Sequence, residues 1–326
     1  MLNIILKLIV AAVIAGTPLL LGALGEILTE KSGNTNLGVE GMMYMGAVSG
    51  IAGAYFYEKA VGGNANGVVG ALIALLISFL IGAFGALIYA FLTITLRANQ
   101  NVTGLTLTIF GTGFGNFFGD YFGKKAGGSL VVGDAIKSAF QGVSIPVLSK
   151  IPVIGKLLFN YNWIVYFAIL VAIAMAWFFN KSRVGLNLRA VGEDPGTADA
   201  AGINVTKYKY IATVVGGGIC GIGGMYISMV SQGGVWVYDC VSGYGWLAVA
   251  LVIFATWDSS RAILVALVFG ALKIMRFYVE LPIPSQFYDM APYIVTILVL
   301  ILTSMRESRE HAQPKSCGTN YFREER

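Results

Sequence analysis

Residues 67–96 read GVVGALIALLISFLIGAFGALIYAFLTITL and contain no charged side chain. About 20 apolar residues are enough for a helix to cross a bilayer, so this run predicts a membrane-spanning helix. Comparable runs recur along the chain, and together they predict an all-α membrane bundle of about nine helices, within a range of roughly eight to ten. The predicted spans are residues 4–24, 37–57, 67–96, 101–121, 161–180, 207–231, 244–257, 261–279 and 289–305.

The composition agrees with a chain that mostly faces lipid. Of 326 residues, 56% are hydrophobic and 12% are charged, whereas soluble domains carry about 25% charged residues. The net charge is +5, but the basic residues form no single patch, which argues against nucleic acid as a partner. They gather at the ends of apolar runs, and because cytoplasmic loops are enriched in Lys and Arg, this pattern predicts a cytoplasmic C-terminus.

One membrane domain, residues 1–305, accounts for nearly all of the chain. Residues 122–160 interrupt the apolar pattern with Gly, Ser, Pro and scattered Lys, and we expect an external hairpin or an interfacial helix there. Residues 183–206 form a polar segment between two spans, on the cytoplasmic side. Residues 306–326 are charged, which predicts a solvated and partly disordered cytoplasmic tail.

The polar segment 183–206 contains a short helix with its own start and stop signals. Asp194 can cap the helix, Pro195 suits the first helical position, and Gly202 can close the helix in the left-handed conformation. An isolated helix of this length is unstable in water. We therefore expect this helix to dock into another protein on the cytoplasmic side.

Polar side chains also break the apolar pattern where the second span begins. Asn34 and Asn36 lie in a glycine-rich turn, and Glu40 lies inside the apolar run. A charge at membrane depth is costly unless it is paired or faces a watery cavity, and irregular backbone there must line a cavity or be buried in protein. We interpret the asparagines as a wall of a solute pathway. For Glu40, a pathway position and a structural carboxylate bonded to neighbouring backbone are equally compatible with the pattern.

A second polar cluster precedes the fourth span and contains Asn99, Gln100, Asn101 and Thr103. Amides both donate and accept hydrogen bonds, which suits an uncharged solute that is polyhydroxylated or heterocyclic. These four residues are therefore further candidates for the pathway. For Asn99 taken alone, an ordinary cytoplasmic turn is the simpler interpretation.

Glycines at 111, 115, 119 and 123 fall on one face of the fourth span. Small residues at this spacing allow helices to approach closely in membranes. The stripe therefore predicts close packing inside the chain, and the more specific alternative is an interface between subunits.

The motifs of enzymes and ATPases are absent from this sequence. It contains no G-x-x-x-x-G-K-[ST] phosphate loop and no H-E-x-x-H or C-x-x-C motif. The single histidine, His311, lies in the tail, and Cys220, Cys240 and Cys317 have no metal-binding spacing. We therefore expect no enzyme activity, no bound metal and no cofactor in this chain.

Residues Glu30–Met43 resemble a known permease signature. Their sequence, EKSGNTNLGVEGMM, is similar to E-R-x-G-x-x-N-x-G-x-E-G-M-M of membrane permeases from bacterial nucleoside ABC importers, with Lys31 in place of the usual Arg. Residues 185–203 are similar to the cytoplasmic coupling segment of the wider group, which includes ribose and branched-chain amino-acid permeases. The stretch 99–104 and Pro292-Tyr293 also resemble the nucleoside branch, whereas residues 256–258 depart from its usual Gly-x-Trp-x-Pro.

This resemblance implies a multi-pass subunit of the bacterial cytoplasmic membrane that forms half of a nucleoside pathway. Its partners would be a second, different permease, an ABC ATPase that binds the ATP and Mg, and a lipid-anchored substrate-binding protein. The residues expected to couple to the ATPase are Arg189, Glu193, Asp194, Pro195, Ala198, Ala201 and Gly202. A permease for a simple sugar, a riboflavin-like solute or an amino acid is the alternative, and a stand-alone carrier or channel is a further one.

Overall fold

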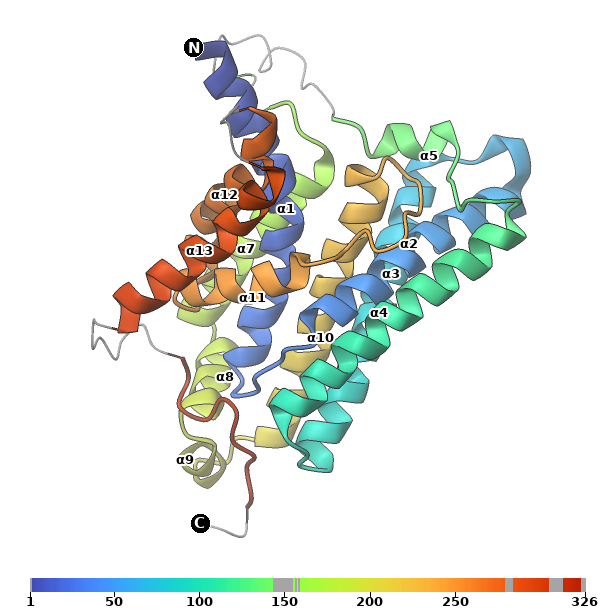
Figure 1. Cartoon of the computed structure of the whole chain (residues 1–326). Coiled ribbons are helices and arrows are strands. Elements are labelled where there is room, and N and C mark those ends of the chain that lie inside the picture. Colours follow the sequence, from blue (N-terminus) through green and yellow to red (C-terminus); the bar gives the residue numbers. More distant parts are fainter. Residues whose placement is uncertain are drawn as a thin grey trace.

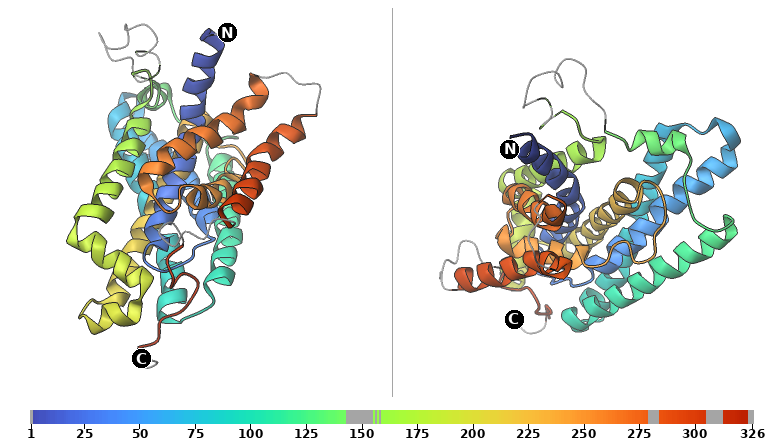
Figure 2. Two further views of the ribbon diagram at one scale, coloured as in Figure 1. Left: turned by 90° about the vertical axis from the view of Figure 1, so that its left-hand side faces the viewer. Right: turned by 45° about the horizontal axis from the view of Figure 1, so that its top comes forward.

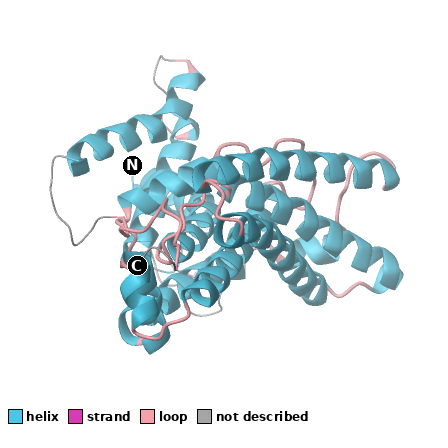
Figure 3. Ribbon diagram, turned by 90° about the horizontal axis from the view of Figure 1, so that it is seen from below, coloured by secondary structure: helices cyan, strands magenta, loops and turns pink. Residues whose placement is uncertain are grey.

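The computed structural model describes residues 2–142, 155, 157, 159–278, 284–304 and 313–323. This part of the chain is almost entirely helical, with one isolated β-bridge between Val131 and Val235 (Figures 1 and 3). The α-helices are α1 (Leu2–Glu30), α2 (Val39–Val61), α3 (Gly67–Ala90), α4 (Gln100–Lys125), α5 (Asp134–Ala139), α7 (Trp163–Lys181), α8 (Arg183–Glu193), α9 (Pro195–Ala200), α10 (Val205–Tyr226), α11 (Tyr244–Phe254), α12 (Ser259–Ile274) and α13 (Ser285–Ser304).

Short turns of other helix types extend several of these elements. The π-helical turn η2 (Phe91–Thr95) continues α3, and η4 (Ile227–Ser231) continues α10. The 3₁₀ turns are η1 (Gly62–Asn64) and η5 (Met275–Phe277).

A helix occupies each of the nine predicted spans, which confirms the all-helical fold. Among the described residues, four helical stretches are both long and apolar enough to cross a membrane, namely Ile5–Glu30, Gly67–Thr95, Trp163–Lys181 and Val205–Ser231. Helices α2 and α4 are long but richer in glycine and polar side chains, and α11 and α12 are short. The structure therefore supports several crossings, and the count of nine stays a prediction.

Glycine contacts hold the centre of the bundle, where α10 packs against α1, α2 and α3. A Cβ atom at Gly46 of α2 would lie 2.1 Å from the carbonyl oxygen of Gly221 in α10. A Cβ at Gly25 of α1 would lie 2.3 Å from the carbonyl oxygen of Gly216. Since membrane helices gain little from the hydrophobic effect, this close backbone approach is a main source of their packing energy.

The glycine stripe of α4 also packs inside the chain. A Cβ at Gly111 would lie 2.4 Å from the Cα of Gly41 in α2, and Gly119 contacts the indole of Trp236 in the same way. The packing interpretation of this stripe is therefore confirmed for its central residues. Helices α4 and α13 lie on opposite sides of the bundle (Figures 1 and 2).

The two ends of the bundle carry different segments. Helices α8 and α9 lie with residues 313–323 at one end, which we call the coupling end, and α5 lies at the other (Figure 1). The N-terminal end of α1 and residues 313–323 also lie at opposite ends of the bundle (Figure 1). Of the predicted external segment 122–160, residues up to Lys125 belong to α4, and residues 143–154 lie outside the described part.

Candidate functional site

Two helices, and not one, form the polar segment at the coupling end. Ser182 caps α8, because its Oγ accepts a hydrogen bond of 2.9 Å from the Gly185 N–H. Asp194 caps α9 by accepting from the Thr197 N–H at 3.0 Å, and Pro195 occupies the first turn. Gly202 closes the segment with φ +83°. The predicted signals of α9 are confirmed, whereas α8 was not expected.

The cap at Asp194 is also an electrostatic feature. Hydrogen bonds from the hydroxyl and the backbone N–H of Thr197 lower the pKa of the Asp194 carboxyl below its usual value. Asp194 therefore stays ionised at neutral pH, where a negative charge at a helix N-terminus is favourable.

Most of the predicted coupling residues lie on the surface, and one is buried. Five of them are exposed, namely Arg189, Glu193, Asp194, Ala201 and Gly202. Pro195 is half-buried. Ala198 is buried in a small apolar cluster with Val191 and Val205. Ala198 therefore attaches α9 to the rest of the chain, and the exposed residues are the ones free to contact a partner.

Residues 313–323, which we call the C-terminal strap, fold back across the coupling end. Ser316 Oγ donates to the carbonyl oxygen of Gly192 at 2.6 Å, and Tyr321 donates to the Asp199 carboxylate at 2.7 Å. The Cys317 thiol donates to the carbonyl of Glu30 at 3.1 Å. Residues 313–323 are thus attached to the bundle through hydrogen bonds to backbone near helix ends and to the Asp199 carboxylate, whereas a solvated, partly disordered tail over 306–326 stays a prediction. Residues 305–312 and 324–326 lie outside the described part.

Gln100 joins the strap to the start of α4. Its Oε1 accepts hydrogen bonds from the backbone N–H groups of Thr35 at 2.7 Å and Gly318 at 3.2 Å. Its Nε2 donates to the carbonyl oxygen of Thr319 at 3.2 Å. Gln100 is buried, and its amide holds together three segments that are distant in the sequence.

The three residues predicted together with Gln100 do not line the cavity that Gln100 lines. Asn99 caps α4 by accepting from the Val102 N–H at 3.0 Å, which is the ordinary turn considered as its simpler interpretation. The Thr103 hydroxyl donates to the Asn99 carbonyl at 2.8 Å, and Asn101 is exposed on the surface of α4. The structure therefore does not bring Asn99, Asn101 and Thr103 together with Gln100 around one cavity.

Asn34 and Asn36 are buried, but they have different contacts. Asn34 Nδ2 donates to the Thr213 hydroxyl of α10 at 3.1 Å. Asn36 Oδ1 accepts from the Gly38 N–H at 2.9 Å at the start of α2, and its own N–H donates to Glu26 Oε1 at 3.0 Å. Asn36 therefore has a local structural role, whereas Asn34 also lines a cavity.

Glu40 caps another helix. Its carboxylate accepts hydrogen bonds from the backbone N–H groups of Gly243 at 2.6 Å, Gly245 at 2.7 Å and Trp246 at 3.3 Å, at the N-terminus of α11. These contacts agree with the structural-carboxylate interpretation, because both oxygens are occupied by protein. A role of Glu40 in the pathway stays a prediction.

In the described part of the chain, three buried acidic or basic residues lie outside the predicted site. Glu26 and Glu30 lie in the last two turns of α1, which continues six residues beyond the predicted span. Glu30 accepts a hydrogen bond from the Trp257 indole. Lys209 lies in the first turns of α10 and is 3% exposed. Acidic and basic residues inside membrane segments are rare and usually functional, and this rule could have identified all three.

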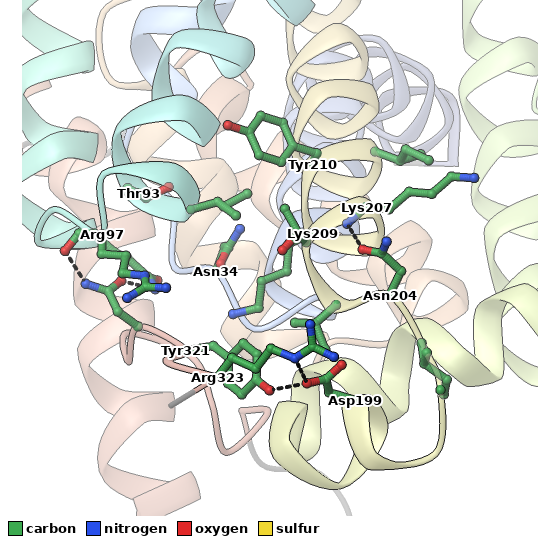
Figure 4. A pocket seen from close by; sticks show the side chains of 18 residues that line it. Asn34, Thr93, Arg97, Asp199, Asn204, Lys207, Lys209, Tyr210, Tyr321 and Arg323 are labelled. Atoms are coloured by element: carbon green, nitrogen blue, oxygen red, sulfur yellow. Dashed lines mark hydrogen bonds and ion pairs between the residues drawn. The ribbon is translucent and has the colours of Figure 1, made fainter. Parts of the chain in front are cut away.

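A cavity of about 760 Å³ opens at the coupling end between α10, η2 and the C-terminal strap (Figure 4). Of the predicted pathway residues, Asn34 and Gln100 line it, and Gly202 of the coupling segment lies at its wall. Its other polar lining residues include Arg97, Asp199, Asn204, Lys207, Lys209, Tyr210, Asn320 and Arg323. The cavity therefore has a mixed polar and apolar wall whose charged residues are mainly basic, and it touches α9 directly through Asp199.

Comparison with known proteins agrees with this arrangement. A family model described as "Branched-chain amino acid transport system / permease component" matches residues 8–302. The chain belongs to this permease family. The predicted kinship with ABC permeases is thus confirmed, and with it a multi-pass membrane protein whose role is transport and not catalysis.

Three relatives match almost the full length of this permease. NupQ of Bacillus subtilis, a guanosine ABC transporter permease protein, is 35% identical over 99% of this chain and 98% of NupQ. NupC of Lactococcus lactis, a nucleoside ABC transporter permease protein, is 32% identical over 98% of each. TsgC13 of Haloferax volcanii, provisionally named a glucose ABC transporter permease protein, is 35% identical over 96% of this chain and 97% of TsgC13.

Family membership sets the partners in general terms. An ABC permease works with an ATPase and with a second permease. Equal identity connects this permease with a guanosine permease and with a glucose permease, so identity alone does not select the solute.

Proposed function

We propose that this permease forms half of the pathway of a nucleoside importer in the bacterial cytoplasmic membrane. In this proposal it pairs with a second, different permease, and a lipid-anchored binding protein delivers the solute. The partner ATPase binds ATP and Mg and docks on the exposed surface of α8 and α9. NupQ and NupC, which match nearly the whole chain, are named for guanosine and nucleosides, which supports this choice of solute.

The observation that carries the coupling role is the link between α9 and the cavity. Asp199 of α9 binds Tyr321 and Arg323 of the C-terminal strap, at 2.7 and 3.1 Å. The strap in turn binds Gln100. A displacement of α9 by a partner would therefore reach the cavity wall through a few direct hydrogen bonds.

The coupling role is tested by reversing a charge on the exposed surface. In cells that contain the complete importer, Glu193→Arg should reduce guanosine uptake strongly and separate it from ATP hydrolysis, while the amount of folded permease stays unchanged. Lys59→Glu is the matched control, because Lys59 is exposed at the end of α2 and lies outside the coupling segment. Unchanged uptake and ATP coupling in Glu193→Arg would show that α8 does not dock the ATPase.

The pathway is tested at two asparagines that the structure separates. Asn34 lines the cavity, whereas Asn101 is exposed on α4. Asn34→Ala should lower guanosine uptake, and Asn101→Ala should not. With the amount of folded permease unchanged, wild-type uptake in Asn34→Ala would exclude Asn34 from the pathway, and a loss in Asn101→Ala would place part of the pathway at the exposed surface of α4.

Glucose transport is the second candidate function, since TsgC13 matches as closely as NupQ. Uptake of labelled guanosine and labelled glucose, each measured with the other as competitor, separates the two. Saturable glucose uptake that guanosine does not inhibit would replace the nucleoside proposal.

A further inference from the structure

The cavity wall contains a buried lysine, Lys209, whose ammonium group is not paired with an acidic side chain in the described part of the chain. Lys209 is 3% exposed, and its Nζ makes one long contact, 3.5 Å from the carbonyl oxygen of Gly33. Within the described residues no salt bridge joins it to a carboxylate. Burying an ammonium group without a counter-ion is costly, so such groups normally have a partner of opposite charge.

The Asp199 carboxylate lines the same cavity but is not paired with the Lys209 ammonium. Asp199 already binds the Tyr321 hydroxyl and the Arg323 guanidinium. Across the described part of the cavity wall, the basic side chains outnumber this single acid. The cavity therefore has an excess of positive charge.

Arg97 provides a second cation from a different wall. It follows η2 with φ +55°, and its guanidinium lies 4.6 Å from the ring centre of Phe322 in the strap. Figure 4 shows the side chains of Arg97 and Lys209 entering the cavity from η2 and from α10, with Asn34 above Lys209. The two cations and the nearby amide therefore line one cavity and supply several hydrogen-bond donors to it.

We propose that this cavity binds a phosphate-bearing anion between Lys209 and Arg97. A guanidinium and an ammonium are the side chains best suited to phosphate oxygens. The cavity volume of about 760 Å³ leaves room for more than a free phosphate ion. The phosphate can belong to a nucleotide from the cytoplasm or to an anionic lipid, since basic pockets between membrane helices on the cytoplasmic side bind lipid headgroups.

This site goes beyond the proposed transport of nucleosides, which are uncharged and need no cation. A bound phosphate would connect α10 to the segment after η2 and to the loop at Gly33. Because these segments surround the cavity, the anion would regulate how readily the coupling end changes shape.

The proposal is tested by direct binding to the full chain in phosphatidylcholine nanodiscs. The probes are inorganic phosphate, guanosine monophosphate and added phosphatidylglycerol, with binding measured by calorimetry for the first two and by native mass spectrometry for the lipid. Wild type should bind at least one probe saturably. Lys209→Met should weaken that binding on the order of tenfold, the effect of losing one charge-assisted hydrogen bond. Lys181→Met, an exposed lysine at the end of α7, should leave it unchanged.

Arg97→Gln gives a second test that does not disturb the core, because Arg97 is exposed. It should weaken binding by a similar factor, and it decides the question if Lys209→Met does not fold. Binding of guanosine monophosphate or phosphate identifies a soluble ligand, and binding of phosphatidylglycerol alone identifies a lipid. No binding by wild type, or wild-type affinity in both variants, would overturn the proposal. Guanosine uptake does not enter this test, so its outcome is independent of the proposed function.

Discussion

The carboxylate of Glu40 allows the two interpretations of this residue to be separated by one substitution. Three backbone N–H groups at the start of α11 donate to it, at 2.6, 2.7 and 3.3 Å. In Glu40→Gln the side chain keeps one acceptor oxygen, and its NH₂ group faces a donor. At least one strong hydrogen bond is then lost and one buried N–H has no acceptor.

The expected cost follows from these contacts. A hydrogen bond to a charged group contributes about 1.5–3 kcal/mol, and an unsatisfied buried donor costs a further 1–3 kcal/mol or so. Allowing for partial relaxation, we expect a loss on the order of 3 kcal/mol in the free energy of unfolding. Thermal unfolding in detergent micelles, followed by Trp fluorescence, should show a melting temperature several degrees lower.

The control and the function assay complete this test. Glu193→Gln, on the exposed face of α8, should change the free energy of unfolding by less than about 0.5 kcal/mol. Any loss of guanosine uptake in Glu40→Gln should follow the amount of folded protein. A variant with wild-type melting temperature and no uptake would refute the structural interpretation and assign Glu40 to the solute pathway.

Three further predictions concern packing, pH and the strap. Gly111→Ala should destabilise the protein by about 1–3 kcal/mol because its Cβ would clash with α2, whereas Gly113→Ala on the same helix, with open space around it, should stabilise it by about 0.5–1 kcal/mol; thermal unfolding of both variants checks this. The lowered pKa of Asp194 stabilises the fold above the ordinary Asp value of 3.8 and the effect is lost as pH falls through the lowered pKa, so melting temperatures of wild type and Asp194→Asn should converge in acid and differ at pH 7. Tyr321→Phe removes the hydrogen bond to Asp199 and should increase proteolysis of the strap without unfolding the bundle, as limited digestion and mass spectrometry would show.

The sequence predicted the helices better than their contacts. Uninterrupted apolar runs and local caps such as Asp194 depend on neighbouring residues, so the spans and α9 could be located directly. The role of Glu40 could not, because its partners lie about 200 residues later in the chain. Both interpretations fit the local pattern, and only the position of α11 distinguishes them.

Other differences have similar physical reasons. The predicted first span ends at residue 24, yet α1 continues to Glu30 and buries both Glu26 and Glu30. The C-terminal strap has the composition of a free tail, but its polar groups bind the backbone at Gly192 and the amide of Gln100. The composition of a segment therefore does not predict whether it is buried, because burial depends on residues that are distant in the sequence.

The C-terminal strap also sets an order of assembly. Residues 313–323 leave the ribosome after α1, α4, α8 and α9, all of which they contact or adjoin. The surface of α8 and α9 therefore matures only after the membrane helices have been inserted. In the proposed docking of the ATPase on α8 and α9, a nascent or truncated chain lacks the residues that complete this surface, so the order of synthesis delays binding of the ATPase until the bundle is in place.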